Sequence, residues 1–358
     1  MKEELRRTWP LWTASWPGVG GRIRERLEDF EVEEVAAYEP CGQGEHLFLW
    51  VEKRGVGSEY LLRAVAQCLG IPVRAVGAAG LKDRYAITRQ WLSVPQECAE
   101  RLGRLESLQA EGIHLLRVER HRNKLKTGHL RGNRFCIFIR GASAAAPWQA
   151  ILEKIRRDGL PNYYGPQRFG REGNTLALGW QCLRGQLPRS LRPFQVRLAL
   201  SAVQSHLFND YLARRQEDGL LRTALEGDVM AHWPVGGLFR VQDVAAEQRR
   251  LEAREIVPAG PMFGRRTYPA AGVAAQREAE VLQRYGLTPS VFAGFGQLLS
   301  GTRRHNLIYL DDLQAEWEPQ GLRLRFTLSA GSYATVLLRE IMKNDAVEAA
   351  SLDENEGE

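Results

Sequence analysis

The stretch Ala79-Gly80-Leu81-Lys82-Asp83-Arg84-Tyr85-Ala86-Ile87-Thr88-Arg89-Gln90 places one carboxylate between two cations in a short turn. Glycines precede this turn, and the alternating pattern that follows it is typical of a half-buried strand. Residues 73–94 therefore predict a strand, a turn that carries Asp83, and a second strand. Lys82 and Arg84 would favour the ionised form of Asp83. The alternative interpretation is a solvated turn aspartate.

The chemistry that suits Asp83 is catalysis at the anomeric carbon of a sugar. A carboxylate can act there as nucleophile or base, and the short side chain of aspartate can be held rigidly. Surrounding cations can hold the phosphates of RNA. The turn therefore predicts an acid presented at the mouth of a cationic cleft.

Composition and charge indicate the number of domains, the kind of partner and the cellular compartment. A chain of 358 residues suggests two domains, and a net charge of +6 favours a polyanionic partner. The five cysteines are widely spaced without a Cys-x-x-Cys pair, which indicates a reducing compartment rather than disulfides or a zinc site. Without a signal peptide or an apolar run of membrane-spanning length, the sequence predicts a cytoplasmic protein.

Strand-like and helix-like patterns alternate along the chain in a way that predicts an α+β fold. Strands are expected at 29–35, 46–51, 135–139, 307–310 and 322–328. Helices are expected at 60–69 (capped by Ser58), 148–157, 197–215, 241–254, 273–285 and 334–342. We therefore expect residues 1–159 and 305–345 to form one discontinuous catalytic domain around a more helical insert, 160–304. The acidic residues 346–358 are expected to be disordered.

A basic segment, residues 117–134, borders the strand expected at 135–139. Its cations are Arg117, Arg120, Arg122, Lys124, Lys126, Arg131 and Arg134. Spaced cations of this kind fit phosphate contacts, so Arg122, Lys124, Lys126 and Arg131 join Lys82 and Arg84 as candidate RNA-binding residues. Asn133 is a candidate for binding a base edge. The alternatives are a solvated basic loop and, for Asn133, a residue that begins a strand.

Two further segments are rich in candidate pocket residues. Residues 161–170 offer Tyr163 as a stacking surface beside Arg168, although a packed turn is the alternative there. Tyr333 precedes the last helix and is a candidate pocket wall. The sequence has no glycine-rich phosphate loop, no Gly-x-Ser-x-Gly elbow and no metal-ligand spacing among its histidines. We therefore expect a reaction without a cofactor or a metal.

Five motifs in order resemble one known family over residues from about 20 to 342. They are GLKDRYAIT at 80–88, HRNKLK at 121–126, GNRF at 132–135, NYYGPQRFG at 162–170 and GSYAT at 331–335. Together they resemble the TruD family of pseudouridine synthases. The resemblance implies a catalytic domain on a mixed, mainly antiparallel sheet, interrupted by a TRUD domain peculiar to the family.

The resemblance also implies an activity and a set of site residues. The family's catalytic aspartate falls on Asp83, and its substrate-binding positions fall on Phe30, Asn133 and Tyr333. The last position is usually Phe in the family, so the ring is kept here and a hydroxyl is added. The implied reaction is the cofactor-independent isomerisation of a uridine in tRNA, usually at position 13 in bacterial members. No membrane or obligate protein partner is implied.

Two other functions compete with isomerisation. A non-catalytic RNA-binding protein would use the same cationic cleft without needing Asp83. An N-glycosidase would break the same bond and release free uracil, but it would need a second carboxylate as general acid. No such partner lies beside Asp83 in the sequence, which disfavours the glycosidase.

Overall fold

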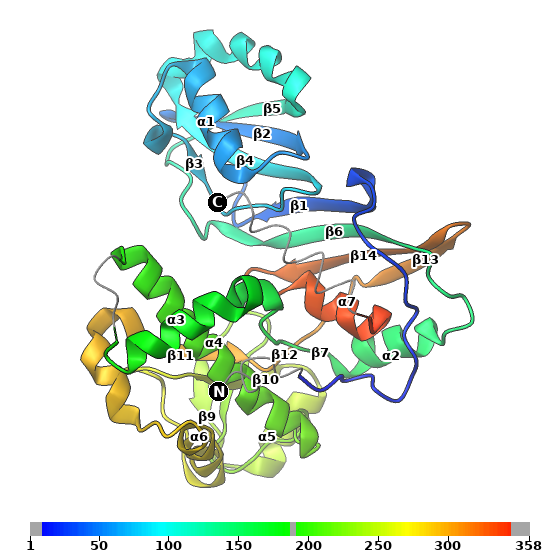
Figure 1. Cartoon of the computed structure of the whole chain (residues 1–358), viewed down its shortest axis with the longest axis vertical. Helices are drawn as coiled ribbons and strands as arrows, with labels where there is room; N and C mark the ends of the chain where they lie inside the picture. The colour runs from blue at the N-terminus through cyan, green and yellow to red at the C-terminus, as the bar shows by residue number, and fades with distance from the viewer. Residues whose placement is uncertain (1–8, 187–190, 345–358) are drawn as a thin grey trace. The chain divides into compact units, whose positions relative to one another are not determined.

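The computed structural model describes residues 9–186 and 191–344, which form two compact units (Figure 1). The sheet unit contains residues 18–148, 310–334 and 341–344. The helical unit contains the described residues of 9–17, 149–309 and 335–340. The domain limits expected at 160 and 304 stay a prediction. The predicted acidic tail, 346–358, lies outside the described residues.

An eight-stranded sheet forms the centre of the sheet unit, in the order β13-β14-β6-β1-β4-β2-β5, with β3 also paired to β4. The strands are β1 (Phe30–Ala36), β2 (His46–Arg54), β3 (Gly77–Ala78), β4 (Ile87–Pro95), β5 (Ile113–His121), β6 (Leu130–Arg140), β13 (Gln314–Glu318) and β14 (Gly321–Ser329). β1 and β4 run parallel, and the other pairs are antiparallel. The expected mixed, mainly antiparallel sheet is therefore confirmed.

The register of these strands assigns side chains to two faces. Residues paired across neighbouring strands lie on the same face, and successive residues of one strand lie on opposite faces. The Asp83 face, so named because the Asp83 loop packs on it, carries Phe30, Val32, Glu34, Lys53, Thr88 and Asn133. The opposite Trp50 face carries Glu33, Trp50, Arg89, Trp91 and Arg134.

Helices cover part of the Asp83 face. Leu49 and Val51 of β2 belong to one apolar cluster with Leu61 and Val65 of α1 (Ser58–Leu69) and Leu105 of η4 (Gln96–Glu111). Two short 3-10 turns, η2 (Leu27–Asp29) and η3 (Val73–Ala75), complete this unit. The packing fixes the start of α1 beside the loop that carries Asp83.

The helical unit is built around α4, whose side chains are buried on nearly every side. Its helices are α2 (Trp148–Asp158), α3 (Asn174–Leu183), α4 (Pro193–Glu217), α5 (Val244–Glu252), α6 (Gly272–Arg284) and most of α7 (Ala334–Met342), with η5 (Pro166–Phe169), η6 (Arg171–Gly173) and η7 (Pro289–Leu299). Its strands are β7 (Leu160–Pro161), β8 (Val229–His232), β9 (Leu238–Arg240), β10 (Ile256–Met262), β11 (Thr302–His305) and β12 (Leu307–Ile308).

The helical unit also holds a four-stranded sheet, in the order β11-β10-β8-β9, that the sequence patterns did not predict. Its central strand β10 contains Pro258 and Pro261, and prolines argue against a central strand. The first half of β10 pairs only with β8 and the second half only with β11. Each proline therefore occupies a local edge, where its missing N–H is tolerated.

For the basic segment 117–134, the alternative of a solvated basic loop holds only in part. Residues up to His121 belong to β5 and residues from Leu130 onward belong to β6, so only the intervening residues form a loop. Among the helices in the described part of the chain, none is long and apolar enough to span a bilayer.

Gly179 provides a test of the packing between α3 and α4. A Cβ atom at this position would lie 2.1 Å from the carbonyl oxygen of Ala199 and 2.6 Å from Cγ2 of Val203. We expect Gly179→Ala to lower the free energy of unfolding by about 1–3 kcal/mol, because the two helices would have to separate. Gly294→Ala is the matched control, since nothing lies within 4 Å of its added Cβ. Urea denaturation that gave equal stabilities for the two variants would contradict this packing.

Candidate active site

Backbone anchors hold the loop that carries Asp83 between β3 and β4. The Lys53 ammonium of β2 donates a hydrogen bond to the Asp83 carbonyl oxygen at 2.5 Å. The Ser58 hydroxyl accepts from Lys82 N at 2.8 Å and donates to Lys82 O at 2.9 Å. Ser58 was expected to cap α1, but Gly57 occupies the cap position. Ser58 instead joins the first turn of α1 to the loop.

Lys82 lies inside the protein rather than on a surface that faces RNA. Its ammonium is 2.8 Å from a carboxylate oxygen of Glu34, and the two side chains are only 4% and 1% exposed. Glu34 also accepts a hydrogen bond from Trp91 N, at 3.4 Å. The prediction that Lys82 contacts RNA therefore finds no support in its placement, because its charge is already paired in the interior.

The cation that contacts the Asp83 carboxylate is Arg24, which the sequence reasoning missed. Nη2 of Arg24 lies 3.3 Å from Oδ2 of Asp83. The Arg24 side chain is 8% exposed, whereas that of Asp83 is 31% exposed. The carboxylate is thus open to solvent on one side and held by a buried cation on the other.

An aromatic ring supports Arg24 by direct contact. The guanidinium carbon of Arg24 lies 4.0 Å from the centre of the Phe30 ring. That ring meets Phe135 edge-on, with 6.2 Å between the ring centres. Phe30 itself is only 2% exposed. In this structure Phe30 therefore contacts Arg24, and direct contact between Phe30 and a substrate stays a prediction.

Asn133 lies on the same face of the sheet, close to the anchor of the loop. It pairs with Glu34 of β1 on one side and with Leu328 of β14 on the other. Its Oδ1 atom is buried and has no hydrogen-bond partner among the described residues. A buried acceptor without a partner is costly, so a donor supplied by a ligand would stabilise it.

Tyr333 follows β14 at the same end of the sheet. The last pair of that strand joins Ser329 to Gly132, next to Asn133, and Ala330 N donates to the Arg131 carbonyl oxygen at 2.9 Å. Tyr333 is half-buried, four residues beyond the end of β14 and directly before α7. The fold thus brings the turn of Tyr333 to the strand that carries Asn133.

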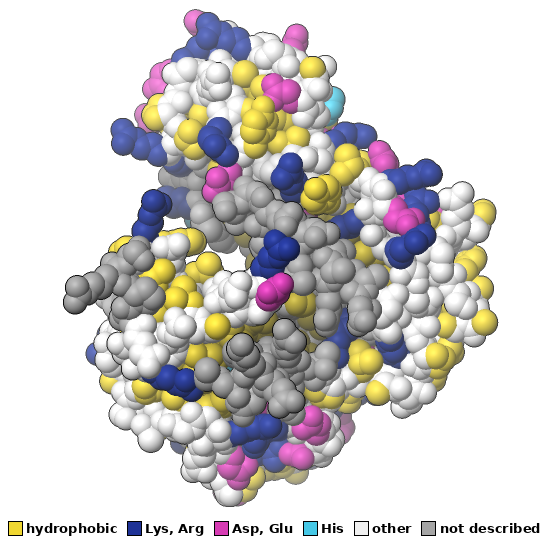
Figure 2. All heavy atoms as spheres, viewed as in Figure 1, with side chains coloured by type: hydrophobic (Ala, Val, Ile, Leu, Met, Phe, Trp, Pro, Cys, Tyr) yellow, Lys and Arg dark blue, Asp and Glu magenta, His cyan; other side chains and the backbone are white. Residues whose placement is uncertain are grey.

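The candidate phosphate-binding residues differ in exposure. Arg84, Arg122, Lys126 and Arg131 are exposed, whereas Lys124 is half-buried and donates to the Arg74 carbonyl oxygen. Figure 2 shows Lys and Arg side chains dispersed over the visible face, with acidic side chains among them. The exposed cations border the Asp83 loop and the loop between β5 and β6.

The other two candidates belong to the helical unit. Tyr163 is 2% exposed, and its hydroxyl donates to Gln216 at 3.0 Å, so its ring is packed inside the unit. Arg168 is half-buried, and its Nε donates to the Ser205 hydroxyl at 3.0 Å. These contacts give both residues a structural role within their unit.

Chemically, the site offers one partly exposed carboxylate, a fixed cation and an unsatisfied amide oxygen. In the part of the chain that the structure describes, no three His, Cys, Asp or Glu side chains gather as metal ligands would. Asp83 can act as a nucleophile or a base, and Arg24 can stabilise its charge.

Comparison with known proteins identifies relatives along almost the whole chain. The family model for tRNA pseudouridine synthase D (TruD) matches residues 9–195 and 185–341. A tRNA pseudouridine synthase D of Anaeromyxobacter dehalogenans is 45% identical over 342 residues, covering 94% of this chain and 97% of the relative. One from Thermus thermophilus is 43% identical over 341 residues, covering 95% of this chain and 94% of the relative.

A solved structure agrees with these sequence relatives. A crystal structure from Methanosarcina mazei, assigned to tRNA pseudouridine synthase D, superimposes with a TM-score of 0.79 at 25% sequence identity. The alignment covers 97% of this chain and 98% of that one.

The ion pair between Lys82 and Glu34 can be tested by a double-mutant cycle. We expect Lys82→Met alone to lower the free energy of unfolding by about 3–5 kcal/mol, because it leaves the Glu34 carboxylate buried and unpaired. Adding Glu34→Leu should recover much of that loss, since no lone charge then remains inside. Urea denaturation measures both. Effects that simply add in the double variant would argue against a direct pair.

Proposed function

The chain belongs to the TruD family of tRNA pseudouridine synthases, and we propose that it isomerises a uridine of tRNA with Asp83 as the catalytic carboxylate. The expected target is uridine 13, and the expected compartment is the cytoplasm. The observation that carries the proposal is the arrangement around Asp83. A partly exposed carboxylate is held by a buried arginine on the face of the sheet that also carries the unsatisfied Asn133 oxygen.

The target uridine has to leave the base stack before it can reach Asp83, which costs roughly a few kcal/mol. Exposed cations such as Arg84, Arg122 and Lys126 would hold the RNA backbone during that step. In this proposal Asn133 Oδ1, which has no partner among the described residues, accepts a hydrogen bond from N3–H of uracil, and Tyr333 provides a ring against the base. The pairing of the Asn133 acceptor would offset part of the unstacking cost.

Asp83 then breaks the bond between C1′ of the ribose and N1 of uracil. Two routes fit a single carboxylate: attack on C1′, or removal of the C2′ proton. Arg24 fixes the carboxylate and balances its charge in either route. The freed uracil keeps the electron pair of the broken bond and turns within the pocket, and C5 bonds to C1′. This step displaces the Asp83 carboxylate from C1′ in the first route, whereas in the second route Asp83 returns the proton to C2′. C5 then loses its proton and N1 gains one. Uracil is thus both leaving group and nucleophile, and exclusion of water prevents hydrolysis of the sugar.

Asp83→Asn tests the catalytic role. We expect isomerisation to be lost while the dissociation constant for tRNA stays within a few-fold, because the amide keeps the shape but not the nucleophile or base. Release of tritium from C5 of uracil in labelled tRNA measures turnover. Glu100→Gln, an exposed carboxylate on η4, is the control and should keep full activity.

The same assay separates the competing functions. An N-glycosidase would release free uracil, and a non-catalytic RNA-binding protein would exchange no tritium at all. Substantial turnover by Asp83→Asn would refute the role of this residue while leaving an enzymatic function intact.

Arg24 is expected to act through Asp83 as a positioning residue. Arg24→Met should lower kcat by roughly 10- to 1000-fold with a small change in KM, because an ordered charge partner is lost. Arg24→Lys should recover part of kcat, since its ammonium restores the charge without the planar fork. Single-turnover kinetics with saturating enzyme measures this directly. A change in KM alone would instead place Arg24 among the RNA contacts.

A further inference from the structure

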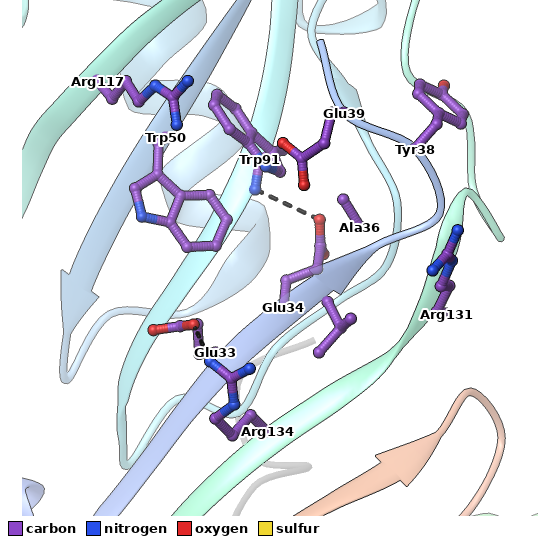
Figure 3. Close-up of a pocket in the computed structure, with 11 residues that line it drawn as sticks. Glu33, Glu34, Ala36, Tyr38, Glu39, Trp50, Trp91, Arg117, Arg131 and Arg134 are labelled. Carbon is purple, nitrogen blue, oxygen red and sulfur yellow. Dashed lines mark hydrogen bonds and ion pairs between the residues drawn. The ribbon is translucent and has the colours of Figure 1, made fainter.

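A pocket opens beside Trp50 and Trp91, next to the part of β1 that follows its pairing with β4 (Figure 3). Its volume is about 360 Å³, which lies in the range of small-ligand sites. Its lining comes from β1, β2, β4, β5 and β6 and from the turn after β1, and includes Glu34, Tyr38, Glu39, Trp50, Trp91 and Arg131. Of these residues, Glu34 anchors the Asp83 loop through Lys82, and the mechanism proposed above assigns no role to the others.

Two tryptophans form one wall. The ring centres of Trp50 and Trp91 are 5.1 Å apart, with an angle of 49° between their planes. Trp91 is only 6% exposed and the Arg117 guanidinium carbon lies 6.0 Å from its ring, which fixes it in place. Trp50 is half-buried, so part of its ring faces the opening. A fixed aromatic wall of this kind suits the stacking of a planar base.

Carboxylates provide the polar groups at the middle of the pocket. Figure 3 shows Glu34 and Glu39 with their carboxylates turned toward the space between the tryptophans and Tyr38. Glu34 is occupied by Lys82 and by the Trp91 amide. Glu39 is exposed and makes no hydrogen bond or ion pair with another described residue. The group left to a ligand is therefore an acceptor.

Cations surround the pocket. Arg134 pairs with Glu33 at 2.8 Å and Arg117 pairs with Glu119 at 2.9 Å, yet these two arginine side chains are 61% and 58% exposed. The Arg131 side chain is exposed and has no partner among the described residues. Together they can meet phosphates on either side of a bound base.

We propose that this pocket binds an unpaired guanine of the RNA substrate. Guanine is the base that offers two adjacent donors, N1–H and the N2 amino group, and a carboxylate can accept both at once. Trp50 stacks on the base, Glu39 accepts from its edge, and Arg131 contacts a flanking phosphate. The proposal rests on the function proposed above, because it takes RNA as the ligand.

The start of β6 links this pocket to the Asp83 face. Asn133 on the Asp83 face and Arg134 on the Trp50 face are successive residues of β6, near the start of that strand. Arg131, two residues before Asn133, borders the pocket. An RNA strand that passes the first residues of β6 can therefore place one nucleotide at Asp83 and a second at Trp50.

Guanine protection from kethoxal, which reacts with N1 and N2 of unpaired guanine, tests the proposal. With the wild-type protein, we expect one reactive guanine of tRNA to become protected. Glu39→Gln and Trp50→Ala should each remove that protection and weaken tRNA binding by roughly 5- to 100-fold. Turnover at saturating tRNA should change by less than about two-fold. Arg63→Ala, an exposed arginine on α1, is the control for a general loss of charge.

The outcomes distinguish this proposal from the catalytic one. If no guanine loses protection in Glu39→Gln and Trp50→Ala, or if their tRNA affinity is unchanged, the pocket is not a guanine site. Tritium release by the wild-type protein tests the catalytic proposal independently of the guanine site. Glu39→Gln changes an exposed side chain, and a thermal melt equal to that of the wild type would show that folding is intact.

Discussion

The buried ion pair between Lys82 and Glu34 ties the catalytic loop to the central sheet. Two charges that are almost fully removed from water stabilise a fold only when each keeps its partner. The pair therefore fixes the loop next to β1, and Ser58 and Lys53 add hydrogen bonds to its backbone. With its neighbour immobilised in this way, Asp83 can keep a partly exposed carboxylate in one place.

How much of this site the sequence predicted depends on the range of the interactions. The turn around Asp83 and the strand after it follow from local glycines and alternation, which act over a few residues. Arg24 and Asp83 are 59 positions apart in the sequence, so no local pattern connects them. The backbone of Arg24 also has a φ of 61°, which is rare for arginine. Nothing local to Lys82 distinguishes a buried lysine from an exposed one, so the sequence did not predict its burial, and its contact with RNA stays a prediction.

The same reasoning applies to the folds of the two units. Local patterns located several strands of the large sheet, whereas its mixed, mainly antiparallel character was expected from the resemblance to the TruD family. The smaller sheet was missed because β10 contains two prolines, which are tolerated only through its split pairing. Whether a proline-containing segment forms a strand depends on which distant strands pair with it. The local sequence pattern carries no information about those partners.

The path of the chain between the two units has a practical consequence for anyone who wishes to isolate either one. The backbone crosses from one unit to the other after residues 17, 148, 309, 334 and 340. No single cut in the gene separates them, since each unit is assembled from distant pieces of the polypeptide. Because both units contain residues of α7, neither unit has all of its parts until that helix has been synthesised.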